Sequence, residues 1–291
     1  MSLPELRNLT DRLSKHAVLP NLIPNLALRR AERTTGYEAL MYEPMIYFVL
    51  QGEKQLSIGR KTLTYGAAHF LILSVDVPVN ARVLQASNEK PFLGIEIRLS
   101  PDLAREGALE ILPALPVEAD PAFAVGSLSG ATVDVLTRLT ALMDTPADAA
   151  HLAPLYTREL LYRIGQGPQG HLLRDALRIG GQTVQVQRAI DWIKANFREK
   201  ISIDRLADIA GMGVTTFHRR FKSVTNLSPG AYHKMVRLHE ARRLLLDART
   251  VSSVAFAVGY ESASQFSREY AVMFGAPPRA DVLSEQSRPS R

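Results

Sequence analysis

VTTFHRRFK, residues 214–222, places two phenylalanines four residues apart among a histidine, two arginines and a lysine. On a helical wheel of about 100° per residue, Val214, Phe221 and Val224 fall within about 60° of Phe217. The opposite side of the wheel carries the polar and cationic residues, Thr215, His218, Arg219 and Lys222. The pattern predicts a helix with one buried aromatic face and one positively charged outward face.

The same pattern on the helical wheel is repeated further along the chain. Phe266 and Tyr270 stand where Phe217 and Phe221 stood. The outward side becomes Ser264, Ser267, Arg268 and Ala271. Each copy follows a shorter helical stretch, LADIAG or VAFAVG, through a turn that contains glycine. A short helix, a tight turn and a second helix, present twice, predict two helix-turn-helix units.

An outward row of short polar residues and arginine suits the major groove of DNA, because small side chains allow close approach and arginine offers a fork to guanine. A buried face must hold that row at a fixed angle. We assign this core role to Phe217, Phe221, Phe266 and Tyr270. Between the units, the helical stretch from about Pro229 to Asp247 spans roughly 28 Å, close to the ~34 Å between successive major-groove faces. One chain is therefore expected to reach two adjacent grooves.

Three serines mark helix starts in this region. Ser202 is expected to cap one helix, and Ser228 is followed by Pro229 in a first-turn position. Ser262 together with Gln265 fits a capping box.

The charge is distributed unevenly. From Thr183 onward the chain has 17 Lys and Arg against 10 Asp and Glu, whereas the preceding part has 18 against 19. The net charge of +6 is therefore carried by the last third, which favours a polyanionic partner such as nucleic acid for that part. An ordinary solvated basic face is the alternative that charge alone leaves open.

The composition indicates a folded protein. The 291 residues are 46% hydrophobic and 22% charged, and the length favours two domains. No stretch approaches ~18 consecutive apolar residues, so we expect no membrane helix. The start, MSLPELRNLTDRL, lacks the apolar core of a signal peptide, and there are no cysteines for disulfides, thiolate catalysis or metal binding. These features predict a cytoplasmic protein.

Short apolar runs fill the region from Met45 to Leu99. They are MIYFVLQGE, KQLSIGR, KTLTYG, HFLILSVDVPV, ARVLQAS and PFLGIEIRLS, punctuated by Gly52, Gly59, Gly66 and Pro78. Their β-branched and aromatic content predicts an antiparallel sandwich or barrel. Apolar residues then recur every three to four positions, which predicts helices at 130–145 and 153–165. These helices either cover the open side of the β unit or form a dimer interface.

The last third of the chain resembles the AraC/XylS family of bacterial transcription regulators. The resemblance rests on LADIAGMG, FHRRFKSVTNLSPGAYHKMVRLHEARRLL and VAFAVGYESASQFSREYAVMFGAPP. It implies two helix-turn-helix units whose third and sixth helices enter the major groove of double-stranded DNA. Carried over by position, the residues expected to contact DNA are Thr215, His218, Arg219 and Lys222, then Ala263, Ser264, Gln265, Ser267 and Arg268.

The chain departs from the family pattern at two places. Gly213 stands where the family often has serine, so the first recognition helix lacks a side-chain cap, a difference of only tenths of a kcal/mol. After FGAPP, the usual tyrosine and arginine are replaced by Arg279-Ala280-Asp281, so the closing contacts of the second unit are expected to differ. Further cations lie off the reading faces, where solvent exposure is favoured over phosphate contact: Arg220, Lys234, Arg237, Arg242 and Arg243.

The N-terminal region resembles the cupin-like β-barrel sensor of the same family, through PMIYFVLQGEKQLSIG and YGAAHFLILSVDVPV. The resemblance covers about residues 20–175 and implies a unit that receives a small-molecule signal and dimerises. Many cupins hold a metal with several histidines and a glutamate. Here His69 stands alone, and with Glu96 it does not supply the three ligands of a catalytic metal site. No P-loop, dinucleotide fingerprint or nucleophile elbow is present, so we expect no metal, no cofactor and no catalytic residues.

The glycine-rich stretch GQGPQGHLLRDALRIGGQT is typical of a linker with a short helical part. The predicted fold is α+β and multidomain: an N-terminal cupin-like antiparallel β-barrel with flanking helices, then an all-α domain with two helix-turn-helix units joined by a long helix. The expected bounds are 1–165 for the sensor and dimerisation domain, 166–183 for the linker, 184–285 for the DNA-binding domain and 286–291 for a tail.

These features predict a one-component transcription regulator, more specifically an activator. It is expected to bind double-stranded DNA as a homodimer, to respond to a small-molecule effector and to recruit RNA polymerase. The effector residues stay open, because strand alternation without a register does not say whether Tyr47, His69, Asp76 or Glu96 faces a cavity. Two alternatives remain: a cupin-type enzyme with an accessory basic helical domain, and a ligand-independent regulator whose barrel serves only for dimerisation.

Overall fold

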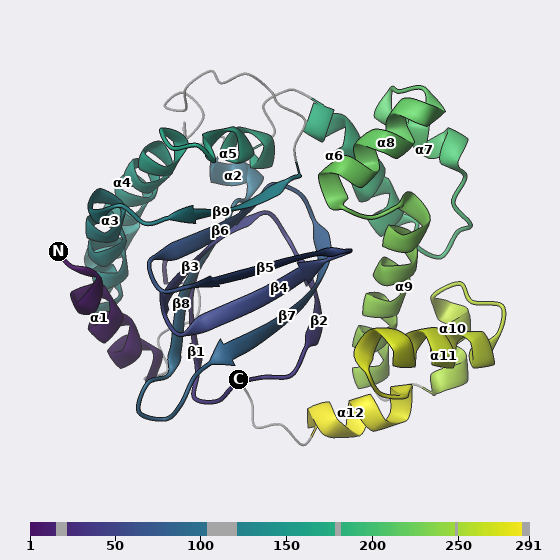
Figure 1. Ribbon diagram of the computed structural model, residues 1–291, viewed down its shortest axis with the longest axis horizontal. Helices are drawn as coiled ribbons and strands as arrows, with labels where there is room; N and C mark the ends of the chain where they lie inside the picture. Colours follow the sequence, from purple (N-terminus) through teal and green to yellow (C-terminus); the bar gives the residue numbers. More distant parts are fainter. Residues whose placement is uncertain (16–21, 104–120, 178–181, 248–249, 287–291) are drawn as a thin grey trace.

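The computed structural model describes residues 1–15, 22–103, 121–177, 182–247 and 250–286 (Figure 1). A sheet-rich N-terminal region carries helices on its outer side, and a wholly helical region follows it. The predicted α+β fold, with a β-barrel followed by two helix-turn-helix units, is confirmed.

The N-terminal region is built from two antiparallel sheets. One has the strand order β1-β8-β3-β6-β9 and the other has the order β2-β7-β4-β5. The strands are β1 (Leu26–Ala31), β2 (Glu38–Tyr42), β3 (Met45–Gln51), β4 (Glu53–Ile58), β5 (Lys61–Gly66), β6 (His69–Leu73), β7 (Val77–Gln85), β8 (Phe92–Arg98) and β9 (Phe123–Ser127). Six of them lie where the apolar runs predicted strands, whereas β1, β2 and β9 were not predicted.

Strand β3 shows why its sequence is an unbroken apolar run. Every residue from Met45 to Leu50 is buried. Ile46, Phe48 and Leu50 pack in the cluster formed with the outer helices, whereas Tyr47 belongs to the cluster inside the barrel. A strand covered on both faces has no need of polar alternation.

The strand boundaries differ from the prediction around Pro78. β6 ends at Leu73, and β7 begins at Val77 and continues to Gln85, so Pro78 lies inside a strand and marks no turn. Its register partner is Met41 of the edge strand β2. The pairing of β7 with β4 starts at Asn80. No strand on that side therefore requires a hydrogen bond from the backbone N–H that Pro78 lacks.

Helices cover the outer face of the first sheet (Figure 1). They are α1 (Leu3–Lys15), α3 (Gly130–Ala141), a 3₁₀ turn (Leu142–Asp144), α4 (Pro146–Gly165) and α5 (Gly170–Ala176), and the short α2 (Pro101–Leu103) follows β8. Helix α4 begins at Pro146, earlier than the predicted residue 153, because Pro146 suits a first turn. Leu172 and Leu173 of α5 are packed in the N-terminal core, so this part of segment 166–183 is anchored, whereas residues 178–181 lie outside the described part.

The C-terminal region contains α6 (Gln182–Ala195), α7 (Ile203–Ala210), α8 (Val214–Thr225), α9 (Pro229–Leu246), α10 (Val251–Ala257), α11 (Ala263–Phe274) and α12 (Pro278–Gln286). Helices α7 and α8 form the first helix-turn-helix unit, and α10 and α11 form the second. The long helix α9 joins them, as the sequence predicts.

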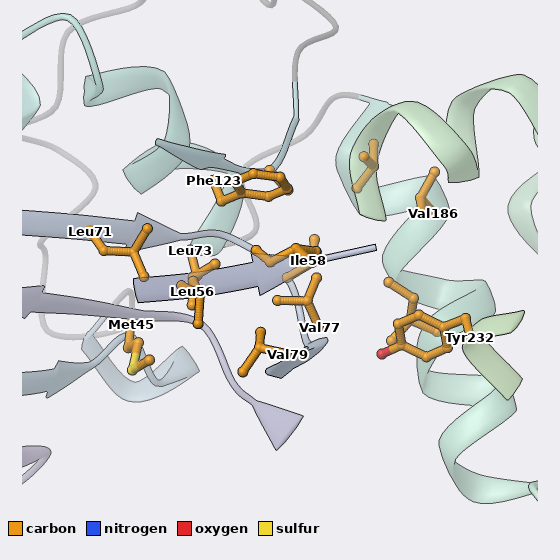
Figure 2. Packing of buried hydrophobic residues seen from close by; sticks show 14 of the residues in the cluster. Met45, Leu56, Ile58, Leu71, Leu73, Val77, Val79, Phe123, Val186 and Tyr232 are labelled. Atoms are coloured by element: carbon orange, nitrogen blue, oxygen red, sulfur yellow. The ribbon is translucent and has the colours of Figure 1, made fainter. Parts of the chain in front are cut away.

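A single apolar cluster runs from the barrel interior into the first unit (Figure 2). Leu56, Ile58 and Val77 from the strands belong to it, and so do Val186 of α6 and Tyr232 of α9. The second unit has a cluster of its own, which includes Val254, Phe266 and Tyr270. The barrel and the first unit thus share a core.

Asp76, in the corner between β6 and β7, fixes this junction. Its carboxylate accepts hydrogen bonds from Lys194 Nζ (2.7 Å) and Gln187 Nε2 (3.1 Å), both on α6. Its backbone carbonyl accepts a hydrogen bond from the Tyr232 hydroxyl at 2.9 Å. We call these four residues, Asp76, Gln187, Lys194 and Tyr232, the docking contact.

The turn between β4 and β5 adds a second point of attachment. Asn226 Nδ2, at the end of α8, donates to the Ile58 carbonyl at 2.5 Å. Gly59 has a φ of +56° there, and a Cβ on it would lie 2.3 Å from the Asn226 carbonyl oxygen. Only glycine therefore allows this close approach of the hairpin to the helix end.

Candidate functional site

The first helix-turn-helix unit is built by ordinary end signals. Ser202 caps α7 by accepting a hydrogen bond from the Arg205 amide, and Gly211 closes that helix in the left-handed conformation. Gly213, the N-cap residue before α8, makes no side-chain cap bond. The predicted Ser202 cap and the predicted absence of a cap before α8 are both confirmed.

The second unit repeats this arrangement with better-capped helices. Thr250 caps α10, and Ser262 caps α11 through the Gln265 amide at 3.3 Å. The capping box predicted for Ser262 and Gln265 is only half formed, because the Gln265 side chain donates to Glu269 at 3.2 Å. Its amide group is thereby held on the exposed side of the helix.

The aromatic anchors of the two units have the same geometry. Phe217 and Phe221 have ring centroids 5.5 Å apart at an interplanar angle of 59°, and Phe266 and Tyr270 have the same values. All four side chains are fully buried. This burial agrees with the core role predicted for them, and the repeat seen in the sequence is a repeat in space.

The residues predicted to contact DNA lie on the opposite faces of α8 and α11. Those that are exposed are Thr215, His218, Arg219, Lys222, Ser264, Gln265 and Arg268. Ala263 and Ser267 are half-buried, and the Ser267 hydroxyl donates to the Ala263 carbonyl at 2.9 Å. Each recognition helix therefore presents an accessible polar row, with arginine in both rows.

Two cations of α9 have structural partners, contrary to the expectation of solvent exposure. Arg237 donates to the backbone carbonyls of Phe197, Arg198 and Glu199. Arg242 forms a two-pronged ion pair with Asp281, at 2.8 and 3.1 Å. These contacts close helix ends and hold α12, so neither side chain is available as a simple surface charge.

Asp281 takes over the closing role where the chain departs from the family pattern. Asp281 is 6% exposed, and its carboxylate accepts a hydrogen bond from the Tyr270 hydroxyl at 2.7 Å in addition to those from Arg242. Burial and this hydrogen bond raise the pKa of Tyr270. The second unit is therefore closed by an Arg-Asp-Tyr network in place of the family's usual residues.

A cavity of about 1840 Å³ lies between the barrel and the helices. Its lining comes from the edge strands β1 and β2, from the inner residues Tyr47 and Lys54, and from Phe197, Val236 and His239 on the helical side. The edge strands belong to different sheets, and the cavity follows the side of the barrel where they lie. A bound molecule here would touch both regions at once.

The four barrel residues left open by the sequence have different surroundings. Tyr47 and Glu96 line the cavity, Asp76 belongs to the docking contact, and His69 Nδ1 lies 3.1 Å from the Ala67 carbonyl. Within the described residues, no three His, Asp or Glu side chains gather in a way that could hold a metal ion.

Sequence reasoning missed Lys54 as a functional candidate. Lysine on a strand usually faces solvent, yet Lys54 is 7% exposed. The alternation in KQLSI places Lys54, Leu56 and Ile58 on one face, and this was the available signal. The pairing of Asp76 with α6 left no such signal, because more than a hundred residues separate the partners.

Two helix-turn-helix units attached to a barrel with a cavity define a class, the DNA-binding regulators with a sensor-like domain. The sequence model of the AraC-type transcriptional regulator N-terminus matches residues 22–172, which is more than half of the chain, and a helix-turn-helix domain model matches residues 206–281. The chain therefore belongs to the AraC-type transcriptional regulators.

Named relatives agree with this family. The chain is 29% identical over 151 residues to the virulence regulon transcriptional activator VirF of Yersinia enterocolitica, over 52% of this chain and 55% of VirF. It is 29% identical over 102 residues to the transcriptional activator RhaS of Pectobacterium carotovorum subsp. carotovorum (strain PC1), over 35% of this chain and 37% of RhaS. The chain thus spans about half or less of the length of these relatives.

The fold is similar to that of ToxT from Vibrio cholerae O395, with a TM-score of 0.57 at 9% identity, covering 90% of this chain and 98% of that chain. A ToxT structure with a bound unsaturated fatty acid, from Vibrio cholerae strain SCE256, gives 0.55 at 10% identity over 89% and 94% of the two chains. At such identities the likeness concerns the fold alone. Among the described residues, no helix has the length and apolar content needed to span a bilayer.

Proposed function

We propose that this protein is a one-component transcription activator that binds double-stranded DNA through α8 and α11. The DNA-contacting residues are Thr215, His218, Arg219 and Lys222 in the first unit and Ala263, Ser264, Gln265, Ser267 and Arg268 in the second. The DNA-binding domain spans 184–285 and the sensor and dimerisation domain spans 1–165. The protein acts in the cytoplasm as a homodimer and recruits RNA polymerase.

One observation carries this proposal. Each recognition helix has a fully buried aromatic pair on one side and an exposed row with an arginine on the other. The 18 residues of α9 that join the units span about 27 Å, which suits two successive major-groove faces ~34 Å apart. Family membership and the activators among the relatives support the same function.

The barrel is the sensor in this proposal. Its cavity borders both the strands and helix α9, so an effector there would contact both regions and favour one arrangement of them over another. The fatty acid in the ToxT structure is bound to a protein of similar fold, which supports a small-molecule effector here. We favour this over a cupin-type enzyme because the family model that matches the barrel region, residues 22–172, is that of a transcriptional regulator N-terminus.

Base preference tests the function. A duplex that the protein selects from a random library would be titrated with wild-type, Arg219→Ala and Arg268→Ala proteins. Each variant is expected to lose about 1–3 kcal/mol of binding free energy and to relax preference at one base pair. A preference lost at different base pairs by the two variants would support two separate reading surfaces.

The matched control is Lys90→Ala, which removes one exposed positive charge from a turn of the barrel. It is expected to bind the selected duplex as wild type does. If both arginine variants retained wild-type affinity and base preference, the assigned reading faces would be wrong. If wild-type protein selected no duplex, the proposed function itself would be wrong.

A further inference from the structure

The inner end of the cavity contains a buried positive charge. Lys54 faces inward from β4 with 7% of its surface exposed. Its ammonium lies 3.8 Å from the ring centroid of Tyr47 and 5.3 Å from that of Tyr42. We call Lys54, Tyr42, Tyr47, Tyr65 and Phe92 the Lys54 site.

No acid neutralises this charge within the described part of the chain. None of the ion pairs there includes Lys54, and the acid of β8 that lines the same cavity, Glu96, is held by Arg29 at 2.7 Å. A buried charge without a counter-ion is unfavourable, and aromatic faces offset only part of its lost hydration. The Lys54 site therefore lacks the anion that would neutralise the charge of the ammonium.

The ammonium keeps its charge at neutral pH. Burial alone would lower the pKa of Lys54, but the interactions with the surrounding tyrosines outweigh burial and raise it. The surrounding tyrosines therefore favour the charged form of Lys54 against the effect of burial.

A second polar group beside Lys54 lacks a partner. Tyr65 lies directly opposite Lys54 in the register of β4 and β5. Its hydroxyl is buried and has no hydrogen-bond partner among the described residues. Buried hydroxyls without partners are uncommon in folded proteins and usually have a specific reason. An anion at the Lys54 ammonium would be adjacent to this donor as well.

The walls around the site select the rest of the ligand. Tyr47 and Phe92 stack with centroids 6.4 Å apart, and Leu40, Met45 and Val83 also line the cavity. The anchor within the Lys54 site is one ammonium with neutral hydroxyls, because Arg29, an arginine of the lining that interacts with tyrosines of the site, is paired with Glu96, whereas phosphate is typically bound by an arginine fork or a helix N-terminus. Such a site matches a single negative charge attached to an apolar body.

We propose that the Lys54 site binds a small organic monocarboxylate, with its carboxylate on the Lys54 ammonium and its apolar or aromatic body against Tyr47 and Phe92. This inference rests on the proposed sensor function and names the chemical class of its effector. The cavity continues to Val236 and His239 on α9, where the buried His239 Nε2 has no partner among the described residues. A ligand long enough to span the cavity contacts the DNA-binding region directly.

The test uses the full-length protein and a thermal-shift titration. The probes are sodium benzoate, sodium 4-phenylbutyrate and sodium decanoate, with benzyl alcohol, decanol and inorganic phosphate as comparison compounds. At least one carboxylate is expected to raise Tm in a saturable manner, as a ligand of the folded state does. The alcohols and phosphate are expected to have at least tenfold weaker apparent affinity. An equal response to alcohol or phosphate would overturn the carboxylate assignment.

Variants locate the site. Lys54→Met keeps the length of the side chain and removes the charge, so carboxylate affinity should fall at least tenfold while the Tm without ligand does not fall. Lys61→Met, at an exposed lysine of β5, is the matched control and should respond as wild type does. A carboxylate response of Lys54→Met equal to wild type, or no saturable response of wild type to any of the three carboxylates, would overturn the proposal.

The proposal for the Lys54 site and the proposed regulator function can fail independently of one another. DNA binding is measured on the same preparations with the selected duplex and without any carboxylate. Wild-type protein that binds the duplex but ignores the carboxylates would disprove the Lys54 site and leave the regulator function standing. Protein that binds carboxylate through Lys54 but binds no duplex would support the Lys54 site and disprove the regulator function.

Discussion

The two helix-turn-helix units have the same internal geometry and different attachments. The first shares its apolar cluster with the barrel and is tied to it at Asp76 and at Ile58. The second has its own cluster, closed by Arg242, Tyr270 and Asp281. It reaches the barrel through α9 and through α11, both of which lie beside the edge strand β2.

This difference shows how one repeated motif can serve two roles. A change in the barrel is transmitted to the first unit through a common core, and to the second unit through the long helix α9 and the contact of α11 with β2. We therefore expect an effector to move the two recognition helices relative to one another about α9. The contrast between the units can be tested by mutation of equivalent positions.

The largest expected effect comes from truncating one aromatic anchor in each unit. Phe221→Ala and Phe266→Ala each remove a fully buried ring and should cost roughly 3–5 kcal/mol. Because Phe221 lies in the shared cluster, its loss should increase hydrogen exchange in β4 and β7 as well as in α8. Phe266→Ala should increase exchange in α10 to α12 and in the second half of α9, which shares its cluster, and should leave β4 and β7 unchanged. Unchanged exchange in β4 and β7 of Phe221→Ala would break the distinction between the units.

Removing the docking contact should have a smaller effect. Asp76→Ala deletes the acceptor of Lys194 and Gln187, leaves buried polar groups unpaired, and should cost about 2 kcal/mol, with the partly exposed Lys194 screened by water. Thermal unfolding should then separate into a barrel step and a helical step. Asp208→Ala, at an exposed acid of α7, is the control and should keep a single transition. A single transition in both variants would mean that the apolar cluster alone couples the regions.

A pH effect of similar size is expected in the second unit. Burial, assisted by nearby Arg242, lowers the pKa of His239 to about 4, and its ring packs against Phe274 with centroids 5.7 Å apart. The unfolded chain takes up a proton near pH 6.5 while the folded chain does not, so stability falls as the pH drops from about 6.5 towards 4. Between pH 7 and pH 5 the loss should be about 2 kcal/mol. Urea unfolding of wild type and His239→Leu measures it, and an equal pH slope in the two proteins would contradict the assignment.

The smallest effect concerns the caps that distinguish the recognition helices. Gly213→Ser places a hydroxyl where nothing lies within 4 Å of the new Cβ, and should stabilise the first unit by about 0.3 kcal/mol. Ser262→Gly removes the cap of α11 and should destabilise the second unit by a similar amount. Differential scanning calorimetry should show opposite shifts in Tm. Shifts of the same sign would show that caps do not explain this difference.

The sequence predicted the double helix-turn-helix because its anchors lie within short helices, where spacing alone fixes the face. It predicted less of the barrel. β1 carries two adjacent arginines, Arg29 and Arg30, which hide the alternation, although Arg29 is paired with Glu96 and Arg30 with Asp11 in the fold. Leu6 and Leu13 of α1 show helical spacing, but their burial depends on strands that follow later in the chain.

Residues that act through distant contacts were the hardest to predict. Asp76 forms hydrogen bonds with residues of α6 and α9, and Lys54 interacts with three tyrosines on other strands. No local sequence pattern predicts such contacts, because they depend on the register of the sheets and on how the two regions pack. Most residues that the sequence predicts to contact DNA, in contrast, lie on the exposed side of α8 and α11, and their contact with DNA stays a prediction.

Hydroxyl-radical footprinting of wild-type protein on a selected duplex tests the central claim most directly, because it records both docking surfaces at once. The structure predicts two protected segments about one helical turn apart on the same side of the duplex, one weakened by Arg219→Ala and the other by Arg268→Ala. A single protected segment, or two segments that both variants weaken equally, would contradict the account.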